Sequence, residues 1–318
     1  MMLGCSLYSS AHCLAIHFLP YYLWLWLETS LFCSGFHLLC NQKNRRKLFR
    51  MLRLGASYFS GCSVSLETFM KLCHELNLDY IEIQAEHPYS PLEMDTKRVT
   101  ELRDLFSNYE LTPLLHGPVH DVNLASIKEQ IRRASVEITK DSIKLADTLG
   151  CQEIVIHAGK CPADQVPFML DRARECAVMS ISELAIFADD LGVKVGVENK
   201  QKGMDREIIM TVDDHIKMVS EFQHLGIFAV LDIGHAFTTG CSLVDYICTL
   251  GNSLKETHFH DNNGQTDDHL ALGHGDVPFE EVVTTLHDID FNGLSILEIK
   301  DIGELSSSVQ YLKKLSAC

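Results

Sequence analysis

Acidic and imidazole side chains recur along this chain, most of them directly after short apolar runs of strand length. Removing a lone carboxylate or imidazole from water at such places is costly. The repeated placement therefore predicts that these side chains face one polar centre, and a bound metal ion is the simplest centre of that kind. The residues concerned are His116, His157, Glu198, Asp232, His235, His258, Asp267, His269 and Glu298.

Apolar runs and helical segments alternate along the sequence. The runs that end on a member of this set are LTPLLH at His116, EIVIH at His157, VKVGVE at Glu198, IFAVLD at Asp232 and LSILE at Glu298. Further strand-like runs are LRLGAS near Leu52, DYIEIQ at 79–84 and LKETHFH at 254–260. Between the runs, apolar residues lie three and four apart, as on one face of a helix, in 127–149, 166–191 and 212–222.

Eight strand-like runs, each followed by a helical stretch, predict an α/β fold of the (β/α)8 TIM barrel type. The carboxyl ends of the strands of such a barrel meet at one mouth, so residues far apart in the sequence share a site. An open doubly wound sheet also alternates strands and helices, but it does not gather eight consecutive strand ends around one point. The barrel is therefore the favoured architecture.

The barrel is expected to occupy residues 51–318, because a domain of this class takes roughly 250 residues. Residues 1–50 differ in composition: an apolar, aromatic-rich stretch is followed by the basic cluster NQKNRRKLFR. Three interpretations of this N-terminal apolar extension stay open. It is a membrane anchor with its basic residues on the cytoplasmic side, a secretory signal, or a stretch upstream of a translation start at Met51.

The charge of the barrel disfavours nucleic acid as a partner. The whole chain has a formal net charge of −16, and residues 1–50 carry five Lys and Arg against one Glu, so the remainder carries −20. A surface that follows nucleic acid phosphates normally carries a basic stripe, although bound divalent ions would neutralise part of the negative charge. The cysteines lack short paired spacing, which indicates reduced thiols in a cytoplasmic protein, membrane-anchored if the extension is expressed.

Five segments together resemble a known superfamily: HGPVHDVNLAS, VIHAG, VENK, LDIGHAFTTG and HFHDNNGQTDDHLALGHG. This superfamily joins the family 2 apurinic endonucleases (endonuclease IV) to the xylose isomerase-like sugar isomerases and epimerases, including proteins like the sugar phosphate isomerases and epimerases. The resemblance covers essentially all of 51–318. Its motifs are specific as a set, although each alone is weak.

The two branches of this superfamily imply different metal sites. The endonuclease branch implies three zinc ions: His116 and His157 hold one and share Glu198 with a second, which Asp232, His258 and Glu298 also bind, and His235, Asp267 and His269 hold the third. The isomerase and epimerase branch implies a single Mn, Mg or Co ion, bound by Glu198, Asp232, His258 and Glu298. Every position of both patterns is present in this sequence.

The isomerase scheme makes physical sense, because a divalent ion that chelates the carbonyl and the neighbouring hydroxyl of a sugar acidifies the adjacent C–H. Glu198 and Glu298 would flank that carbon, one removing the proton and the other returning it. We therefore predict a metal-dependent sugar or sugar phosphate isomerase or epimerase with these two glutamates as catalytic residues. Lys160, Lys200 and His260 are predicted to contact substrate, the lysines through a phosphate; the alternative for each lysine is a solvated loop position.

A zinc-dependent apurinic endonuclease is the second hypothesis, and DNA is a partner only under it. The complete ligand set and the phrases LDxxHAF and NLAS favour it. Two departures disfavour it: Val119 stands where that family places an aromatic residue that probes the abasic gap, and Gly273-His274-Gly275 replaces GEG. A third hypothesis, a metal-binding barrel without catalysis, is opposed by the presence of both glutamates.

Several polar residues outside this set receive structural interpretations. His74, His215, His224 and His287 lie in helical stretches and are expected to be exposed. Asp261 follows His258 by three residues and is expected to orient a metal ligand as a hydrogen-bond acceptor.

Overall fold

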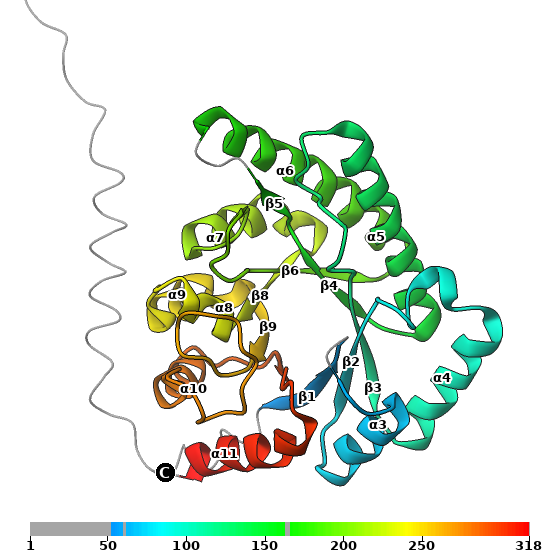
Figure 1. Cartoon of the computed structure of the whole chain (residues 1–318), viewed down its shortest axis with the longest axis vertical. Coiled ribbons are helices and arrows are strands. Elements are labelled where there is room, and N and C mark those ends of the chain that lie inside the picture. Colours follow the sequence, from blue (N-terminus) through cyan, green and yellow to red (C-terminus); the bar gives the residue numbers. More distant parts are fainter. Residues whose placement is uncertain (1–51, 60–61, 163–165, 318) are drawn as a thin grey trace, which may run out of the picture. The chain divides into compact units, whose positions relative to one another are not determined.

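A computed structural model describes residues 52–59, 62–162 and 166–317. Within these ranges eight parallel strands close into a barrel in the order β1-β10-β9-β8-β6-β4-β3-β2. Helices surround this barrel (Figure 1), so the prediction of a (β/α)8 TIM barrel is confirmed. Residues 1–50 lie outside the described residues, and with them the three interpretations of the N-terminal extension.

The barrel strands are short and separated by helices. The strands are β1 (Arg53–Tyr58), β2 (Tyr80–Gln84), β3 (Thr112–His116), β4 (Glu153–His157), β6 (Lys194–Glu198), β8 (Phe228–Asp232), β9 (Leu254–Phe259) and β10 (Leu294–Leu297). The helices are α3 (Leu66–Glu75), α4 (Thr96–Asn108), α5 (Glu129–Leu149), α6 (Pro167–Asp190), α7 (Val212–Glu221), α8 (Ile233–Thr238), α9 (Leu243–Leu250), α10 (Phe279–Asp288) and α11 (Leu305–Ala317). In the described ranges no helix is both long enough and apolar enough to cross a bilayer.

A small antiparallel pair lies outside the barrel. Strand β5 (Lys160–Cys161) follows β4, and strand β7 (Arg206–Glu207) follows β6. Their pairing connects the loops that follow two neighbouring barrel strands, β4 and β6. These loops lie at the carboxyl ends of the strands, where the predicted metal ligands are located.

Side chains at the helix ends explain where several helices begin and stop. The Ser65 hydroxyl accepts a hydrogen bond from the backbone N–H of Thr68 at the start of α3. Thr211 and Asp214 form a reciprocal capping box at the start of α7. Helix α5 ends at Gly150, whose φ of 84° lies in the left-handed region that favours glycine. These local signals fix the helix boundaries and therefore the lengths of the loops that carry the polar residues.

The strands place alternate residues inside the barrel. Phe228 and Val230 of β8 and Val155 of β4 form a small buried cluster of their own, apart from the main core between strands and helices. Gly196 of β6 faces this cluster: a Cβ added there would lie 2.6 Å from the Phe228 ring and from Val230. Because successive strand residues point to opposite sides, the polar residue that ends each of these strands also faces the interior.

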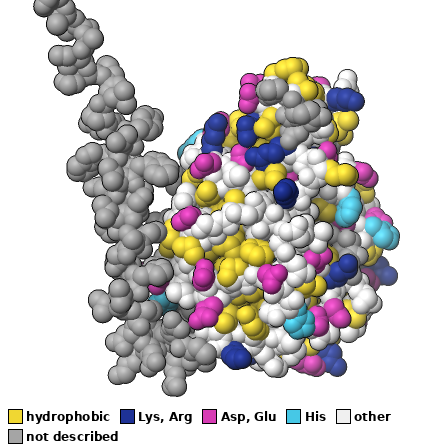
Figure 2. All heavy atoms as spheres, turned by 60° about the vertical axis from the view of Figure 1, so that its left-hand side comes forward, with side chains coloured by type: hydrophobic (Ala, Val, Ile, Leu, Met, Phe, Trp, Pro, Cys, Tyr) yellow, Lys and Arg dark blue, Asp and Glu magenta, His cyan; other side chains and the backbone are white. Residues whose placement is uncertain are grey.

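Figure 2 shows one face of the molecule, on which single Asp and Glu side chains are scattered among apolar and uncharged ones. Lys and Arg side chains gather mainly in the upper part of that view. Among the described residues visible there, the basic side chains form no continuous band of the kind that follows nucleic acid phosphates.

Candidate active site at the C-terminal mouth of the barrel

The polar residues singled out in the sequence come together at the carboxyl ends of the strands. His116, His157, Glu198 and Asp232 are the last residues of β3, β4, β6 and β8. The other members lie on β9, just after β10, on α8 and in the loop after β9. Ligand atoms within 4.8 Å of one another form four groups, two of which share His258. We call His116-His157-Glu198 the first group, Glu198-Asp232-His258 together with Glu82-His258-Glu298 the second, and His235-His260-Asp267-His269 the third.

The first group is built on Glu198, which is buried. Its Oε2 accepts hydrogen bonds from the Nε2 atoms of His116 at 3.0 Å and His157 at 2.7 Å. Its Oε1 lies 3.1 Å from His235 Nδ1. Burial alone would raise the pKa of Glu198, but His157, His116 and His235 hold that pKa well below its ordinary value. Glu198 is therefore a firmly oriented carboxylate.

The two imidazoles that contact Glu198 differ in their proton affinity. Burial lowers the pKa of His116, but the hydrogen bond to Glu198 and the nearby Glu82 outweigh burial and raise that pKa to about 9. Burial and the charge of Lys200 lower the pKa of His157 to about 3. His157 is thus neutral at ordinary pH, as a metal-binding imidazole must be, whereas an ion at His116 would have to displace a proton.

The second group surrounds His258, which is buried in β9. Its Nδ1 lies 3.7 Å from Glu198 Oε1 and 3.5 Å from Glu298 Oε1. Both His258 Nδ1 and Asp232 Oδ2 are buried and lack a hydrogen-bond partner among the described residues. Unpartnered buried polar atoms are costly, so this pair fits a bound cation that would satisfy both.

The third group combines α8 with the loop after β9. Asp267 Oδ2 lies 3.1 Å from His235 Nε2 and 3.4 Å from His269 Nε2. The ring of His260 stacks on that of His269, with centroids 4.0 Å apart, and its Nε2 lies 3.4 Å from Asp267 Oδ1. Burial raises the pKa of Asp267, but the neighbouring His235 and His269 more than offset this and depress it strongly.

Two buried glutamates beneath the mouth were not anticipated from the sequence. Glu256 Oε1 lies 3.1 Å from His258 Nε2, and Glu82 Oε2 lies 3.9 Å from the same nitrogen. His258 therefore turns Nδ1 toward the mouth and is held from behind by carboxylates, the arrangement that usually orients a metal-binding imidazole. A charged residue inside an otherwise apolar strand, as in YIEIQ of β2, is the sequence signal that indicates such an interior position.

Asp261 does not have the role expected for it, which was to orient a metal-binding imidazole. Its Oδ1 accepts hydrogen bonds from the backbone N–H groups of Asn262 and Val277, and its Oδ2 from those of Gly273 and Gly275, at 2.9 to 3.1 Å. The carboxylate therefore folds the loop 262–277 instead of orienting an imidazole directly. Its effect on the site is indirect, since this loop carries two members of the third group.

The residues predicted to touch substrate have different surroundings. Lys160 Nζ pairs with Asp205 Oδ2 at 3.0 Å and is half exposed. Lys200 Nζ lies 3.3 Å from His235 Nε2, and both lysines line a cavity of about 260 Å³ that His157 also lines. His260 is a buried member of the third group. Lys200 is thus the better placed of the two lysines.

The exposure expected for four histidines is wrong for one of them. His74 and His224 are exposed and His287 is partly exposed, but His215 is buried. Its Nε2 donates to the Val197 carbonyl at 2.8 Å, because His215 lies on the buried face of α7 with Met218 and Val219.

A closed parallel barrel with carboxylates and imidazoles gathered at its C-terminal mouth has the arrangement that TIM-barrel enzymes use for their active sites, and these side chains are candidate metal ligands. The chain belongs to the family described as xylose isomerase-like TIM barrel, whose profile matches residues 70–315. The resemblance inferred from the sequence motifs is therefore confirmed at the level of the family.

Relatives from both branches are similar to this chain. Uncharacterized protein MJ1311 of Methanocaldococcus jannaschii is 31% identical over 83% of this chain and 89% of its own. A crystal structure of a D-tagatose 3-epimerase-like protein is 28% identical, with a TM-score of 0.74, and covers 83% of this chain and 97% of its own. Fructoselysine 3-epimerase of Shigella flexneri is 23% identical over 71% and 82% of the two chains. Probable endonuclease 4 of Sulfurihydrogenibium sp. is 26% identical over 66% and 79%.

Proposed function

We propose that this chain is a divalent-metal-dependent sugar isomerase or epimerase that works by proton transfer between two glutamates. One observation carries the proposal: carboxylate oxygens of Glu198 and Glu298 lie 3.7 and 3.5 Å from the same atom, Nδ1 of His258. The two glutamates come from β6 and from the end of β10, with β8 and β9 between them in the barrel. They therefore approach one point from different directions.

The four residues Glu198, Asp232, His258 and Glu298 would hold a Mn, Mg or Co ion. The unpartnered buried atoms Asp232 Oδ2 and His258 Nδ1 support this assignment. When bound, the ion would polarise a sugar carbonyl and so acidify the neighbouring C–H.

The chain's own groups supply the proton transfers. Glu198 is fixed and ionised by three imidazoles, whereas the carboxylate of Glu298 keeps about a tenth of its side-chain surface exposed to the mouth. One glutamate would remove the proton from the substrate carbon and the other would return it. Return on the opposite face inverts the carbon, which is epimerisation, and return to the adjacent carbon is isomerisation.

The names of two relatives support a ketose or ketose derivative as substrate. The D-tagatose 3-epimerase-like protein covers most of this chain, and the fructoselysine 3-epimerase covers 71% of it. Lys200, beside the first and third groups, would suit an anionic end of such a substrate. Lys160 is the weaker choice for the same role because Asp205 already neutralises it.

The direct test is solvent exchange. The full chain, loaded with Mn, Mg or Co, is incubated with a panel of ketohexoses and their phosphates in heavy water, and products are followed by NMR. The expected result is a new epimer or isomer carrying deuterium at the reacting carbon, with loss of turnover in Glu198→Gln and in Glu298→Gln. Metal binding without exchange on any sugar of the panel would remove the proposal.

A zinc-dependent phosphodiesterase acting at abasic sites in DNA is the second candidate, and a specific observation favours it. His235, Asp267 and His269 are assembled within coordination reach of one another, which a single-ion isomerase does not require. Elemental analysis separates the two candidates: about three zinc per chain supports the phosphodiesterase and about one Mn, Mg or Co supports the isomerase. Incision of a duplex with an abasic site, abolished by a chelator, would reverse our ranking.

A further inference from the structure

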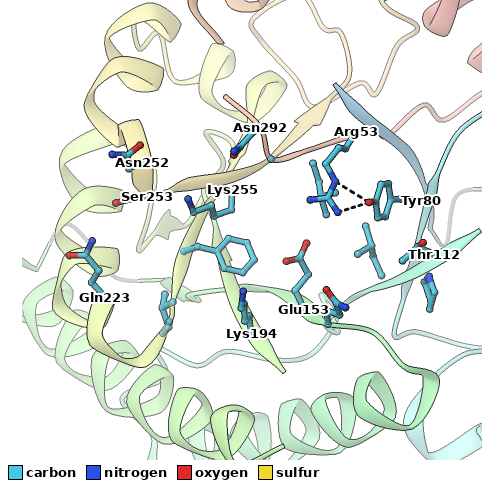
Figure 3. A pocket seen from close by; sticks show the side chains of 18 residues that line it. Arg53, Tyr80, Thr112, Glu153, Lys194, Gln223, Asn252, Ser253, Lys255 and Asn292 are labelled. Atoms are coloured by element: carbon cyan, nitrogen blue, oxygen red, sulfur yellow. Dashed lines mark hydrogen bonds between the residues drawn. The ribbon is translucent and has the colours of Figure 1, made fainter. Parts of the chain in front are cut away.

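The N-terminal end of the barrel, opposite the candidate active site, contains a cavity of about 680 Å³. The first residues of most barrel strands line it, whereas the last residues of several of the same strands form the metal-binding groups. Figure 3 shows Arg53, Lys194 and Lys255 on different sides of this cavity, with Glu153 between them. We call this the basal cavity; its volume is in the range of small-molecule sites, roughly 300–1,000 Å³.

The basal cavity has an excess of positive charge. Arg53, Lys194 and Lys255 face Glu153 as the only carboxylate among the described lining residues, which leaves a formal charge of +2 in a barrel that is otherwise strongly acidic. None of the three cations has a carboxylate oxygen within 4 Å in the described part of the chain. Glu153 interacts with Arg53 and Lys194 through space and offsets part of their charge, and the remaining positive charge is available to a ligand.

Arg53 is held in place by neutral contacts. Its Nε donates to the Tyr80 hydroxyl at 2.9 Å, and its Nη2 donates to the same hydroxyl. Its Nη1 has no hydrogen-bond partner among the described residues. A guanidinium that is oriented by a phenol and keeps free N–H groups is preorganised to bind an oxyanion.

Neutral hydrogen-bonding side chains extend the basal cavity beyond its charges. Gln223, Asn252, Ser253 and Asn292 lie along it (Figure 3). Amides and hydroxyls of this kind suit the sugar or alcohol part of a phosphorylated molecule, while the cations suit the phosphate. The lining thus resembles a site for a small polar anion more than an apolar docking groove.

We propose that the basal cavity binds a small phosphorylated molecule carrying two or more negative charges, through Arg53, Lys194 and Lys255. The site lies at the other end of the barrel from the residues of the proposed catalysis. The inference therefore stands or falls independently of the proposed function.

The test uses inorganic pyrophosphate and the full chain, freed of metal by a chelator that is then removed. Isothermal titration at low ionic strength compares the unmodified chain with the double variant Lys194→Ala/Lys255→Ala. A matched control, Lys71→Ala/Lys217→Ala, removes two exposed lysines from α3 and α7 and so changes the net charge equally. Circular dichroism verifies that all three proteins are folded.

The expected result is saturable binding to the unmodified chain and to the control, weakened at least about tenfold in the cavity variant. Rising salt should weaken the binding in parallel. Absence of saturable binding, or equal binding by both double variants, overturns the proposal. Binding of poly-glutamate without binding of pyrophosphate also overturns it, because the partner would then be an acidic polypeptide.

Discussion

The two ends of the barrel carry opposite kinds of polar chemistry on the same strands. At the C-terminal mouth, carboxylates and imidazoles are buried and contact one another, as in Glu198 with His116 and His157. At the N-terminal end, Lys194 and Lys255 are exposed and have no carboxylate oxygen within 4 Å among the described residues. A strand therefore sets where a side chain lies, whereas burial and neighbouring groups set its charge state and the contacts it can make.

The two ends should also differ in how much stability is lost when a charged residue is removed. A buried charge at the mouth depends on each of its partners, so removal of one leaves the others uncompensated. An exposed lysine at the other end is solvated whether or not a ligand is bound, and its removal should affect stability little.

Glu198→Gln should lower kcat by roughly 100- to 10,000-fold, because an amide cannot accept the substrate proton. The change also replaces the acceptor shared by three imidazoles. The measurement is the initial rate with the best sugar of the panel at saturating metal. Glu175→Gln, at an exposed carboxylate on α6, is the control and should keep the full rate. A Glu198→Gln enzyme with near-normal kcat would remove this residue from the mechanism.

Asp261→Asn should lower the free energy of unfolding by about 3 kcal/mol, since one buried carboxylate accepts four backbone N–H groups and the amide accepts fewer. Urea denaturation of the metal-free chain measures this change. Asp141→Asn, which loses only an exposed pair with Lys144, should change the same quantity by no more than about 0.5 kcal/mol. Equal effects of the two substitutions would contradict the role assigned to Asp261.

Glu256→Gln should weaken binding of the metal ion at His258 by roughly 10- to 100-fold, because the Glu256 carboxylate contacts Nε2 of His258 and so orients Nδ1 toward the ion. Competition with a metal-sensitive dye measures the affinity, and Glu101→Gln on the outer helix α4 serves as the control. The sugar KM should follow the metal affinity and be restored by excess metal. An unchanged affinity would show that His258 needs no such support.

Under the zinc alternative, which counts His116 among the ligands, metal affinity should rise with pH by up to about tenfold per unit below about pH 9. The pKa of His116 is raised in the folded chain, so its protonated form stabilises the metal-free fold below pH 6.5, and this contribution is lost as the pH rises through about 9. An ion at His116 competes with that proton. Metal titrations at several pH values should give a flatter dependence in His116→Gln, and an unchanged slope would contradict this assignment.

The sequence predicted the barrel and the location of most polar residues, because apolar runs of strand length and helical spacing are local signals. Strand ends such as His157 and Asp232 could be assigned to one mouth from the architecture alone. Whether these residues bind metal stays a prediction. The interior glutamates Glu82 and Glu256 were not predicted, because they lie in the middle of strands and the prediction considered only polar residues at strand ends.

The path of one loop and the basal cavity depend on tertiary contacts that produce no periodic pattern in the sequence. The path of the loop 262–277 follows from hydrogen bonds to Asp261, which no spacing rule contains. The basal cavity follows from the register of all the strands, since its cations come from segments far apart in the sequence. His215 is different: its spacing from Met218 and Val219 placed it on the buried face of α7, so its burial could have been predicted.

Carboxylates lie inside the barrel both at the basal cavity, where Glu153 is, and beneath the mouth, where Glu256 and Glu82 are. Burial raises the pKa of Glu256, and the charge of Glu153 at the basal cavity adds to this rise. Burial also raises the pKa of Glu82, which lies next to His258, to about 8, and the charge of Glu256 contributes to it. A five-residue strand spans only about 17 Å, and a protein interior screens charge far less than water does. An anion bound in the basal cavity would therefore raise the proton affinity of the carboxylates inside the barrel, without any movement of the backbone.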